Sequence, residues 1–303
     1  MESSGKIPAA ESLRKTILLE KIKQHQPNVN CDKAEYILSG ADHEVIILDN
    51  KLVYRFPKAN APHESLLDEA HLLTYLNQHI DGVQIPQYTY VADDGSFGSY
   101  EYIHGDPLSA DTFNGLSDED KDTAIGQIAS FLSQLHATPL DIIEKYNVKR
   151  SNPEETYRTL EENVKTFALR RLSKDEQETT LQYLANLRAT LDDEFKSVLK
   201  HGDLKTNNVL WNAVEKQIKI IDFGDREYGD PAGEFWRLVH YGQNVLNRIL
   251  GQYQGSIDAN LQSRIELQYI RPAFRSMWVG VERDDEQRFQ SGYGMFRKYF
   301  YDD

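Results

Sequence analysis

The pattern of hydrophobic and polar positions predicts a short β-rich part followed by a longer helical part. Residues 11–24 have the spacing of an amphipathic helix, and residues 36–56 change to three strands separated by two polar turns. Residues 63–80 return to helical spacing, before two further strand-like segments at 86–91 and 98–103. The first helix has an apolar stripe made of Leu13, Ile17, Leu18 and Ile22. A small sheet with helices packed against it is therefore expected near the start of the chain.

Helical spacing dominates after residue 103, with one exception in the middle of the chain. The helical segments are 117–136, two stretches within 153–199, and then 234–250, 259–281 and 284–301. The exception is a hairpin of two short strands, 209–211 and 218–221, joined by a polar turn. Together the two parts predict an α+β fold.

Polar residues at both ends of this hairpin suit phosphoryl transfer. In such sites one carboxylate accepts the proton of the attacking hydroxyl, while an Asn and a second carboxylate hold Mg²⁺ ions that bridge the nucleotide phosphates. Asp203, Asn208 five residues later and Asp222 fourteen beyond that have the residue types and spacing for these roles. A hairpin with merely solvated ends is the alternative, but this pattern arises by chance in on the order of 1 in 10⁴ chains.

The same stretch resembles the aminoglycoside phosphotransferase family, which has the protein-kinase-like superfold. The resemblance rests on HGDLKTNNVL, IIDFGD and GDPAGEF, and the DFGD form with RFPK upstream is most similar to the aminoglycoside 2″-O-phosphotransferases. It covers residues 36–234 and implies a bilobal fold. Residues 1–103 would form a nucleotide-binding N-lobe around a small antiparallel β-sheet. Residues 104–303 would form a mainly helical C-lobe with the catalytic loop and the substrate-binding helices.

This resemblance assigns roles to the residues around the hairpin. Asp203 would orient and deprotonate the acceptor hydroxyl, and Asn208 and Asp222 would hold Mg²⁺. His201 is expected to hold the catalytic loop through hydrogen bonds and not to titrate. Gly202 replaces the Arg with which protein kinases read a phosphorylated activation loop, so phosphorylation control at this site is not expected.

A cation in the third strand is expected to bind the phosphate oxygens of the nucleotide. Arg55 is the candidate, paired with Glu69 of the following helix. Kinases usually carry a Lys at this position, so Lys58 is the alternative. Pro57 cannot donate a hydrogen bond in a sheet and should end the strand, which favours Arg55.

The rest of the nucleotide would be held by backbone groups. Ser39 and Gly40 lie in the first turn, which in a kinase-like fold covers the phosphates with its N–H groups. The segment HGDPL, residues 104–108, resembles the connection between the lobes. The carbonyl of Glu101 and the amide of Ile103 would hold the base just before it. Because these are backbone contacts, they leave the choice between ATP and GTP open.

The acceptor is expected to be a small cationic molecule, first of all an aminoglycoside antibiotic, with Asp230 and Glu234 as candidate contacts. Asp225 would face either the acceptor or a neighbouring backbone. In the 2″ enzymes further acidic residues follow, whereas here the sequence is FWRLVHYG. A kinase of macrolides, choline or homoserine, a protein-directed kinase, and a nucleotide-binding pseudokinase scaffold are therefore alternatives. The short link at 226–231 argues against a protein substrate.

Composition narrows these classes. The 303 residues suit one two-lobed unit, and the net charge of −14 argues against nucleic acid, whose binding needs basic patches. The charge is compatible with a cationic acceptor, or with solubility alone. The single cysteine, Cys31, excludes an internal disulfide, and no apolar run approaches the ~18 residues of a membrane span. The N-terminus lacks the features of a secretory signal. A cytoplasmic monomer that binds neither membrane nor nucleic acid is expected.

Overall fold

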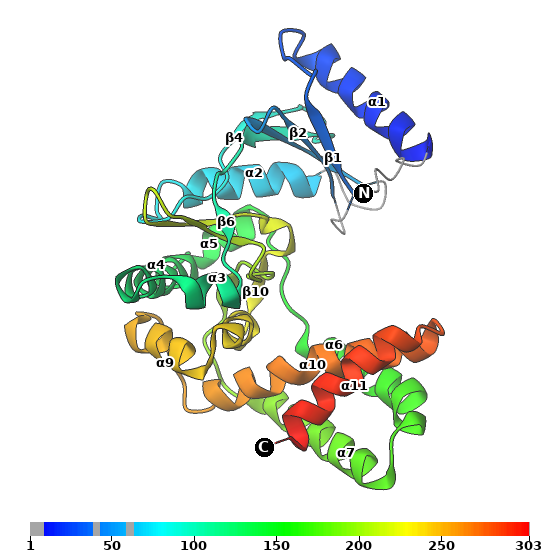
Figure 1. The fold of residues 1–303 in the computed structure, drawn as a ribbon. Coiled ribbons are helices and arrows are strands. Elements are labelled where there is room, and N and C mark those ends of the chain that lie inside the picture. Colours follow the sequence, from blue (N-terminus) through cyan, green and yellow to red (C-terminus); the bar gives the residue numbers. More distant parts are fainter. Residues whose placement is uncertain (1–8, 39–42, 59–63, 303) are drawn as a thin grey trace.

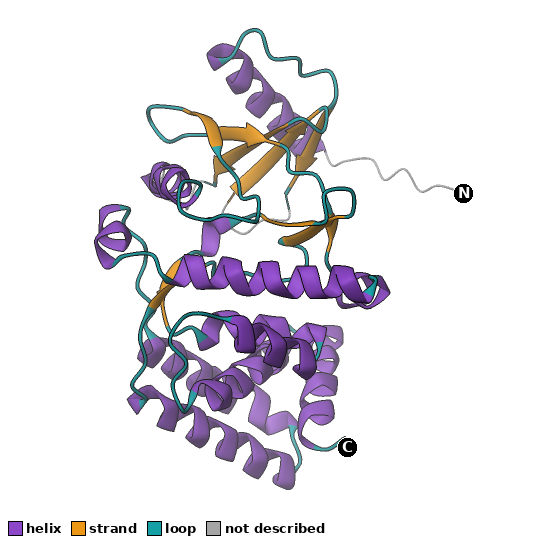
Figure 2. Cartoon of the chain, turned by 90° about the vertical axis from the view of Figure 1, so that its left-hand side faces the viewer, coloured by secondary structure: helices purple, strands orange, loops and turns teal. Residues whose placement is uncertain are grey.

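The computed structural model describes residues 9–38, 43–58 and 64–302 of the chain. They form two lobes, which lie one above the other in Figure 1, with the sheet-containing lobe at the top. Figure 2 shows the same division, because the longer strands lie in the upper lobe and most helices in the lower one. The predicted α+β architecture, a small antiparallel sheet followed by a mainly helical part, is confirmed.

A five-stranded antiparallel sheet forms the N-lobe, in the order β1-β2-β3-β5-β4. Its strands are β1 (Ala34–Ile37), β2 (His43–Leu48), β3 (Leu52–Pro57), β4 (Tyr88–Val91) and β5 (Gly98–Glu101). Arg55 pairs with Val45 on one side and with Gly98 on the other, which places it in the central strand. The strand ends at Pro57, as its missing N–H predicts.

Helix α1 (Ala9–His25) packs on this sheet with its second half. Leu18 and Ile22 are buried in a cluster with side chains of the sheet. In contrast, Leu13 and Ile17 of the predicted stripe are 63% and 44% exposed. The predicted stripe is therefore correct only in its second half.

Helix α2 (Glu64–Leu76) lies between the sheet and the C-lobe (Figure 1). Leu72 and Leu73 belong to the same buried cluster as Ile128 of the C-lobe. The position of α2, and of Glu69 on it, is therefore set by both lobes.

The upper part of the C-lobe is built on one long buried helix. Its helices are α3 (Ala110–Gly115), α4 (Asp118–His136), α5 (Leu140–Lys145), α8 (Ala232–Phe235) and α9 (Gln243–Gln252), with the 3₁₀ helices η4 (Phe223–Asp225) and η5 (Trp236–Tyr241). Ser117 caps α4 by accepting the N–H of Asp120. Two small sheets complete this part. They consist of β6 (Asp106–Pro107), β8 (Val209–Asn212) and β9 (Gln217–Ile220), and of β7 (Val198–Lys200) with β10 (Glu227–Gly229).

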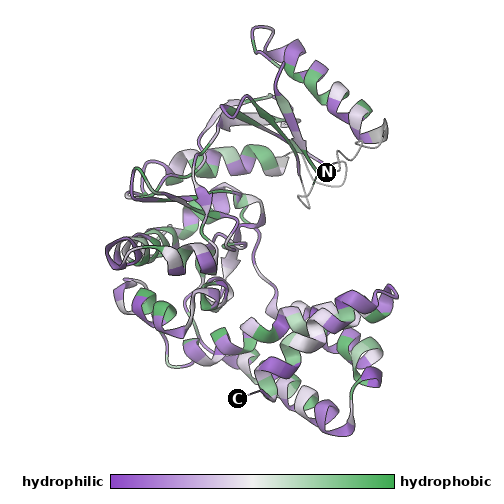
Figure 3. Ribbon diagram, viewed as in Figure 1, coloured by the Kyte–Doolittle hydropathy of each residue, from purple (hydrophilic) through white to green (hydrophobic). Residues whose placement is uncertain are grey.

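A second group of helices forms the lower right of Figure 1 and has its own core. It consists of α6 (Pro153–Asn163), α7 (Lys174–Ala189), α10 (Leu261–Glu282) and α11 (Glu286–Phe300), with a π-helical turn η1 (Val164–Ala168) and the 3₁₀ turns η2 (Leu169–Arg171) and η3 (Thr190–Asp192). Phe274, Phe289 and Phe296 are buried in this core. Hydrophobic and hydrophilic stretches alternate along the helices in Figure 3, as expected for amphipathic helices that pack side by side. Helix α10 also contacts α8 and η5, so it connects this group to the catalytic part of the lobe.

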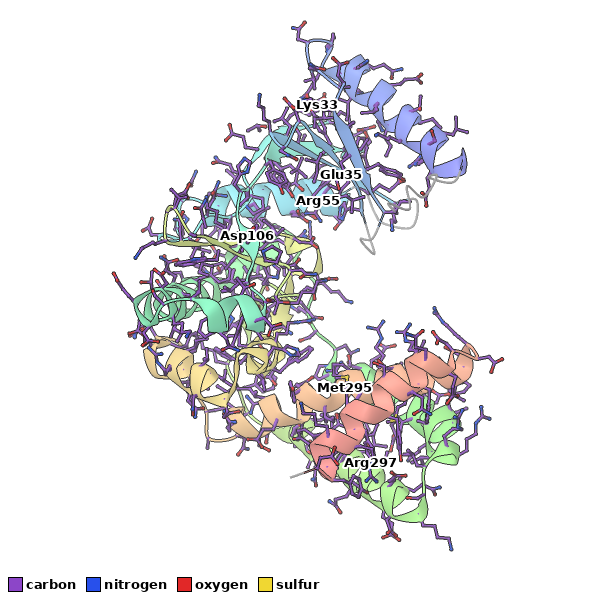
Figure 4. All side chains as sticks on the ribbon, viewed as in Figure 1. Lys33, Glu35, Arg55, Asp106, Met295 and Arg297 are labelled. Atoms are coloured by element: carbon purple, nitrogen blue, oxygen red, sulfur yellow. The ribbon has the colours of Figure 1, made fainter. Side chains whose placement is uncertain are left out.

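The chain passes from one lobe to the other between β5 and β6. Figure 4 shows Arg55 in the sheet and Asp106 near this connection, whereas Met295 and Arg297 lie on the distant helix α11. The lobe boundary at residues 103 and 104 stays a prediction. Within the described residues, no helix is both long and apolar enough to cross a membrane.

Candidate active site

The catalytic loop, residues 201–208, follows β7 and leads into β8. His201 at its start is fully buried. Its Nε2 lies 3.0 Å from the carbonyl oxygen of Ile221, and the N–H of Asp203 donates to its Nδ1 at 3.3 Å. Burial lowers the pKa of His201 to about 4, so the ring is neutral at physiological pH, with its proton on Nε2. The ring therefore ties the loop to the end of β9 without titrating.

Gly202 allows the catalytic loop to contact residues 222–225, which follow β9 and are called the DFG turn. Its φ of +85° is unfavourable for other residues, and a Cβ atom there would lie 1.8 Å from the carbonyl oxygen of Asp225. Any side chain at position 202 would separate the two segments. The glycine in HGD is thus required by the backbone itself.

Three donors surround the carboxylate of Asp203, whose side chain is 13% exposed. Lys205 Nζ lies 2.6 Å from Oδ2, and the amide nitrogen of Asn208 lies 3.1 Å from the same atom. Arg237 Nη1 lies 3.0 Å from Oδ1. These contacts fix the orientation of the carboxylate, which is the property that a residue aligning an acceptor hydroxyl requires.

Asn208 and Asp222 offer oxygen atoms suited to Mg²⁺. The Asn208 amide donates to the carbonyl and the carboxylate of Asp203, which leaves its Oδ1 as the acceptor atom. Asp222 has a left-handed backbone (φ +68°) and a side chain that is 47% exposed. Both line one cleft. Among the described residues, no group of three or more His, Cys, Asp or Glu side chains could hold a metal by itself. Two protein oxygens supplemented by phosphate and water match the preference of Mg²⁺.

Arg55 is buried at the centre of an ion-pair network that joins β3, α2 and the DFG turn. Its Nη1 pairs with Glu69 Oε1 at 2.5 Å, and its Nη2 lies 3.1 Å from Asp222 Oδ1 and 3.1 Å from His43 Nδ1. Burial opposes the charged guanidinium, but the carboxylate of Glu69 outweighs it and holds the pKa of Arg55 well above its ordinary value. The predicted pairing with Glu69 is present. Lys58 is half-buried and does not line the cleft.

Glu69 is shared between two arginines. Its other oxygen lies 3.3 Å from Nη1 of Arg226, and Nη2 of Arg226 donates to the carbonyl of Ser65 at 3.0 Å. Burial would raise the pKa of Glu69, but the charges of Arg55 and Arg226 lower it below its ordinary value. Arg226 therefore attaches the DFG turn to α2, a role that sequence reasoning missed.

The cleft between the lobes has a volume of about 360 Å³. Its apolar walls, which suit a flat base, are formed by Ile37, Val45, Ile47, Val53, Ile103, Leu210 and Ile221. Ile103 lines it, and its backbone N–H has no partner among the described residues. The side chain of Glu101 is exposed and does not line the cleft. The contact between its carbonyl group and the base stays a prediction. Ser39 and Gly40, the predicted phosphate lid, lie outside the described residues.

The three predicted acceptor carboxylates lie in different surroundings. Asp225 is exposed and lines the cleft. Asp230 is paired with Arg264, whose Nε lies 2.9 Å from its Oδ2. Glu234 is fully buried and accepts the N–H of His201, and burial raises its pKa to about 7. Of the three residues, Asp225 lines the cleft and Asp230 and Glu234 do not.

Lys205 and Arg237 are further residues at the site that sequence reasoning missed. Lys205 lies within the catalytic motif two positions after Asp203, and this proximity was an available signal. Arg237 comes from η5 and is brought to Asp203 only by the packing of that helix. Because Arg237 lies far from the motif in sequence, no local pattern predicts its contact with Asp203.

Comparisons with known proteins identify the family and the fold of this chain. Residues 33–264 match the model of the phosphotransferase enzyme family. Viomycin phosphotransferase of Streptomyces vinaceus is 27% identical over 274 residues, which span 85% of this chain and 91% of that protein.

Solved structures show the same fold. The GDP and kanamycin complex of APH(2″)-IIia matches with a TM-score of 0.81 over 93% of this chain and 98% of that one, at 24% identity. Macrolide 2′-phosphotransferase MphH from Brachybacterium faecium matches with a TM-score of 0.66 over 92% and 97% of the two chains, at 18% identity. The predicted bilobal, kinase-like fold is confirmed. Because the family model covers most of the chain, including the catalytic loop and the DFG turn, the chain belongs to the phosphotransferase enzyme family, as its sequence resemblance predicted.

Proposed function

We propose that the protein transfers the γ-phosphate of ATP or GTP to a hydroxyl group of a small molecule in a Mg²⁺-dependent reaction. The observation that carries this proposal is the convergence of the catalytic loop, the DFG turn and Arg55. Asn208 links to Asp203 at 3.1 Å, and Arg55 links to Asp222 at 3.1 Å, around a single cleft with an apolar end. This is the set of groups that phosphoryl transfer requires.

Each residue has a defined task in this proposal. Asp203, held by its three donors, aligns the acceptor hydroxyl and takes its proton, which in a loose transition state leaves late. Lys205 and Arg55 place positive charge against the transferring phosphate and the phosphates behind it. Asn208 and Asp222 would hold Mg²⁺, which when bound neutralises charge on the nucleotide phosphates. The amide of Ile103 would hydrogen-bond the base.

For the acceptor, we take the antibiotics of the relatives as the first candidates. The family membership, the relative that acts on viomycin and the similar structure that holds kanamycin support them. An aminoglycoside remains our primary prediction, with antibiotic resistance as its consequence. A cytoplasmic monomer that avoids nucleic acid also stays a prediction. Kinases of other small molecules and a pseudokinase scaffold are the alternatives.

The test is a coupled assay of nucleoside diphosphate release. Purified protein is supplied with Mg²⁺ and ATP or GTP, and then with kanamycin, gentamicin, viomycin or a macrolide. We expect acceptor-dependent release that stops when EDTA removes the metal. Nucleotide binding without any turnover would favour the scaffold, and no Mg²⁺-nucleotide binding at all would contradict the proposal.

A further inference from the structure

The DFG turn begins with a residue whose backbone conformation has to be held in place. Asp222 has φ +68° and ψ +70°, in the left-handed region, which is unfavourable for a residue with a side chain and persists only where the surroundings fix it. Its Oδ1 accepts a hydrogen bond from Arg55 at 3.1 Å, whereas its Oδ2 has no hydrogen-bond partner among the described residues. One carboxylate oxygen is therefore available to a cation, and its position depends on what holds the turn.

Arg226 holds this turn from its C-terminal end. Its backbone N–H donates to the carbonyl of Phe223 at 3.2 Å and closes the 3₁₀ turn η4. Nη1 of the same residue donates to that carbonyl oxygen at 3.3 Å. The backbone and the side chain of Arg226 thus both bind the residue that directly follows Asp222.

The same guanidinium is anchored to α2 at two points. Nη2 donates to the carbonyl of Ser65 at 3.0 Å, and Nη1 lies 3.3 Å from Glu69 Oε2. Ser65 and Glu69 are four residues apart and therefore lie on the same face of the helix. The side chains of Arg226 and Glu69 are 7% and 1% exposed. A buried guanidinium therefore connects the DFG turn to a helix of the N-lobe.

Arg226 also leaves Arg55 free to contact Asp222. Glu69 Oε1 accepts hydrogen bonds from Arg55 and from the hydroxyl of Tyr88, and only Oε2 faces Arg226. The two arginines and the two carboxylates, Glu69 and Asp222, make an electrically neutral network. Without Arg226, one guanidinium would have to compensate both carboxylates, and its contact with Asp222 would weaken.

We infer that Arg226 is a positioning residue for the metal, because it joins the DFG turn to α2 and so keeps Asp222 where Mg²⁺ is expected to bind. This inference rests on the proposed phosphotransferase function and adds to it a residue that does not line the cleft. Arg226 acts through Asp222, so its loss should weaken metal binding and leave the fit of the nucleotide itself unchanged. Groups that orient metal ligands typically change metal affinity by about 10–100-fold when they are removed.

The test compares nucleotide binding with and without the metal. A non-hydrolysable ATP or GTP analogue is titrated calorimetrically into the protein in Mg²⁺ and in EDTA, and the ratio of the two affinities is the Mg²⁺ enhancement. Arg226→Gln should reduce this enhancement by about tenfold, with the affinity in EDTA unchanged. An Arg226→Gln variant that is folded and keeps the full enhancement would overturn the inference.

Arg226→Lys separates the charge from the bridging contacts and covers the case in which Arg226→Gln does not fold. Lysine keeps a cation beside Glu69, but its single nitrogen does not reproduce the fork that reaches Glu69, Ser65 and Phe223 together. We expect it to lose nearly as much of the Mg²⁺ enhancement as Arg226→Gln. An Arg226→Lys variant equal to the wild type would contradict the bridging role.

Mn²⁺ gives a direct measure of metal affinity. It prefers the same oxygen ligands as Mg²⁺, and the free ion is detected by electron paramagnetic resonance. Titrated into protein that is saturated with the analogue, Mn²⁺ should bind about tenfold more weakly to both Arg226 variants than to the wild type. Equal Mn²⁺ affinity in all three proteins would overturn the inference.

The matched control is Arg264→Lys. Arg264 is also a buried arginine in an ion-pair network, with contacts to Asp230 at 2.9 Å and to Asp258 at 2.8 Å, but it lies on α10 and does not line the cleft. Thermal unfolding should show that both Lys variants are folded and less stable than the wild type. Only Arg226→Lys should lose the Mg²⁺ enhancement. An equal loss in the control would assign the effect to general destabilisation and overturn the inference.

Failure of this inference can be told apart from failure of the proposed function. The Mg²⁺ enhancement of the wild type is measured first. If the wild type binds the analogue no better in Mg²⁺ than in EDTA, both proposals fall. If it shows the enhancement and the Arg226 variants keep it, only the role of Arg226 falls.

Discussion

At the residue scale, the Asp203 carboxylate is the proposed proton acceptor, and Lys205, Asn208 and Arg237 all donate to it. Asp203→Asn keeps the size of the side chain but removes the proton acceptor. We expect turnover to fall by about 10²–10⁴-fold, with nucleotide affinity nearly unchanged. Diphosphate release and calorimetric nucleotide titration check the two parts. Retained turnover would show that another group accepts the proton.

The buried carboxyl group of Glu234, in α8, leads to a prediction about the pH dependence of stability. Its ordinary carboxyl pKa of 4.5 is raised by burial to about 7 in the folded protein, and one of its oxygens has no partner in the described chain. The unfolded chain ionises first as pH rises, so this residue lowers stability progressively between about pH 4.5 and pH 7. The loss is complete above pH 7 and amounts to about 3 kcal/mol.

The Glu234→Gln variant should therefore lack this pH dependence. Its amide cannot ionise, and it can still accept the N–H of His201. We expect the variant to match the wild type near pH 4.5 and to exceed it by about 3 kcal/mol at pH 8. Urea denaturation at both pH values measures the difference. A parallel pH dependence in the two proteins would contradict the buried, protonated state of Glu234.

At the scale of elements, the catalytic loop and the DFG turn meet at Gly202. Gly202→Ala would place a Cβ atom 1.8 Å from the carbonyl of Asp225 and would force an alanine into φ +85°. We expect a loss of at least about 3 kcal/mol in stability, together with loss of turnover, because both segments must shift. Thermal unfolding and the diphosphate assay measure the two effects.

Gly251→Ala is the matched control for this element. Gly251 lies in α9 with nothing within 4 Å of a new Cβ atom, and its φ is not positive. The helix should gain stability by about 0.5–1 kcal/mol. If both variants behaved alike, the contact between the loop and the DFG turn would not be the cause.

At the scale of the whole molecule, the described residues form three buried cores, one beneath α1 in the N-lobe and two that extend through the C-lobe. The larger core joins α2 to the upper C-lobe and supports the cleft, whereas the second core lies among α6, α7, α10 and α11. Phe274 is fully buried in the second core. Phe274→Ala should cost about 3–5 kcal/mol of stability while Mg²⁺-nucleotide affinity stays the same.

Denaturation and nucleotide titration of the same variant test this separation. Val214→Ala serves as control, because Val214 is 95% exposed and should change stability by less than about 0.5 kcal/mol. A Phe274 variant that loses nucleotide affinity in step with stability would show that the two cores act as one unit.

Much of the fold and part of the site could be predicted, because their signals are local. The spacing of Asp203, Asn208 and Asp222 lies within one motif, and period-two and helical patterns locate the strands and most helices. The prediction of which residues are buried was less accurate where burial depends on the extent of a neighbouring element. Leu13 matches a helical stripe but is exposed, since helix periodicity does not say how far a neighbouring sheet extends.

By itself, the sequence determined the kinase-like class and the order of the elements, and it proposed residues for phosphoryl transfer whose roles stay predictions. Only the tertiary structure decided which charges meet. Glu234 was expected at the acceptor but lies buried beneath His201, and Arg237 was not expected but pairs with Asp203. The reason is physical. Hydrogen-bonded turns and periodic faces are set by neighbours in the chain, whereas electrostatic surroundings depend on distances in space between residues far apart in sequence.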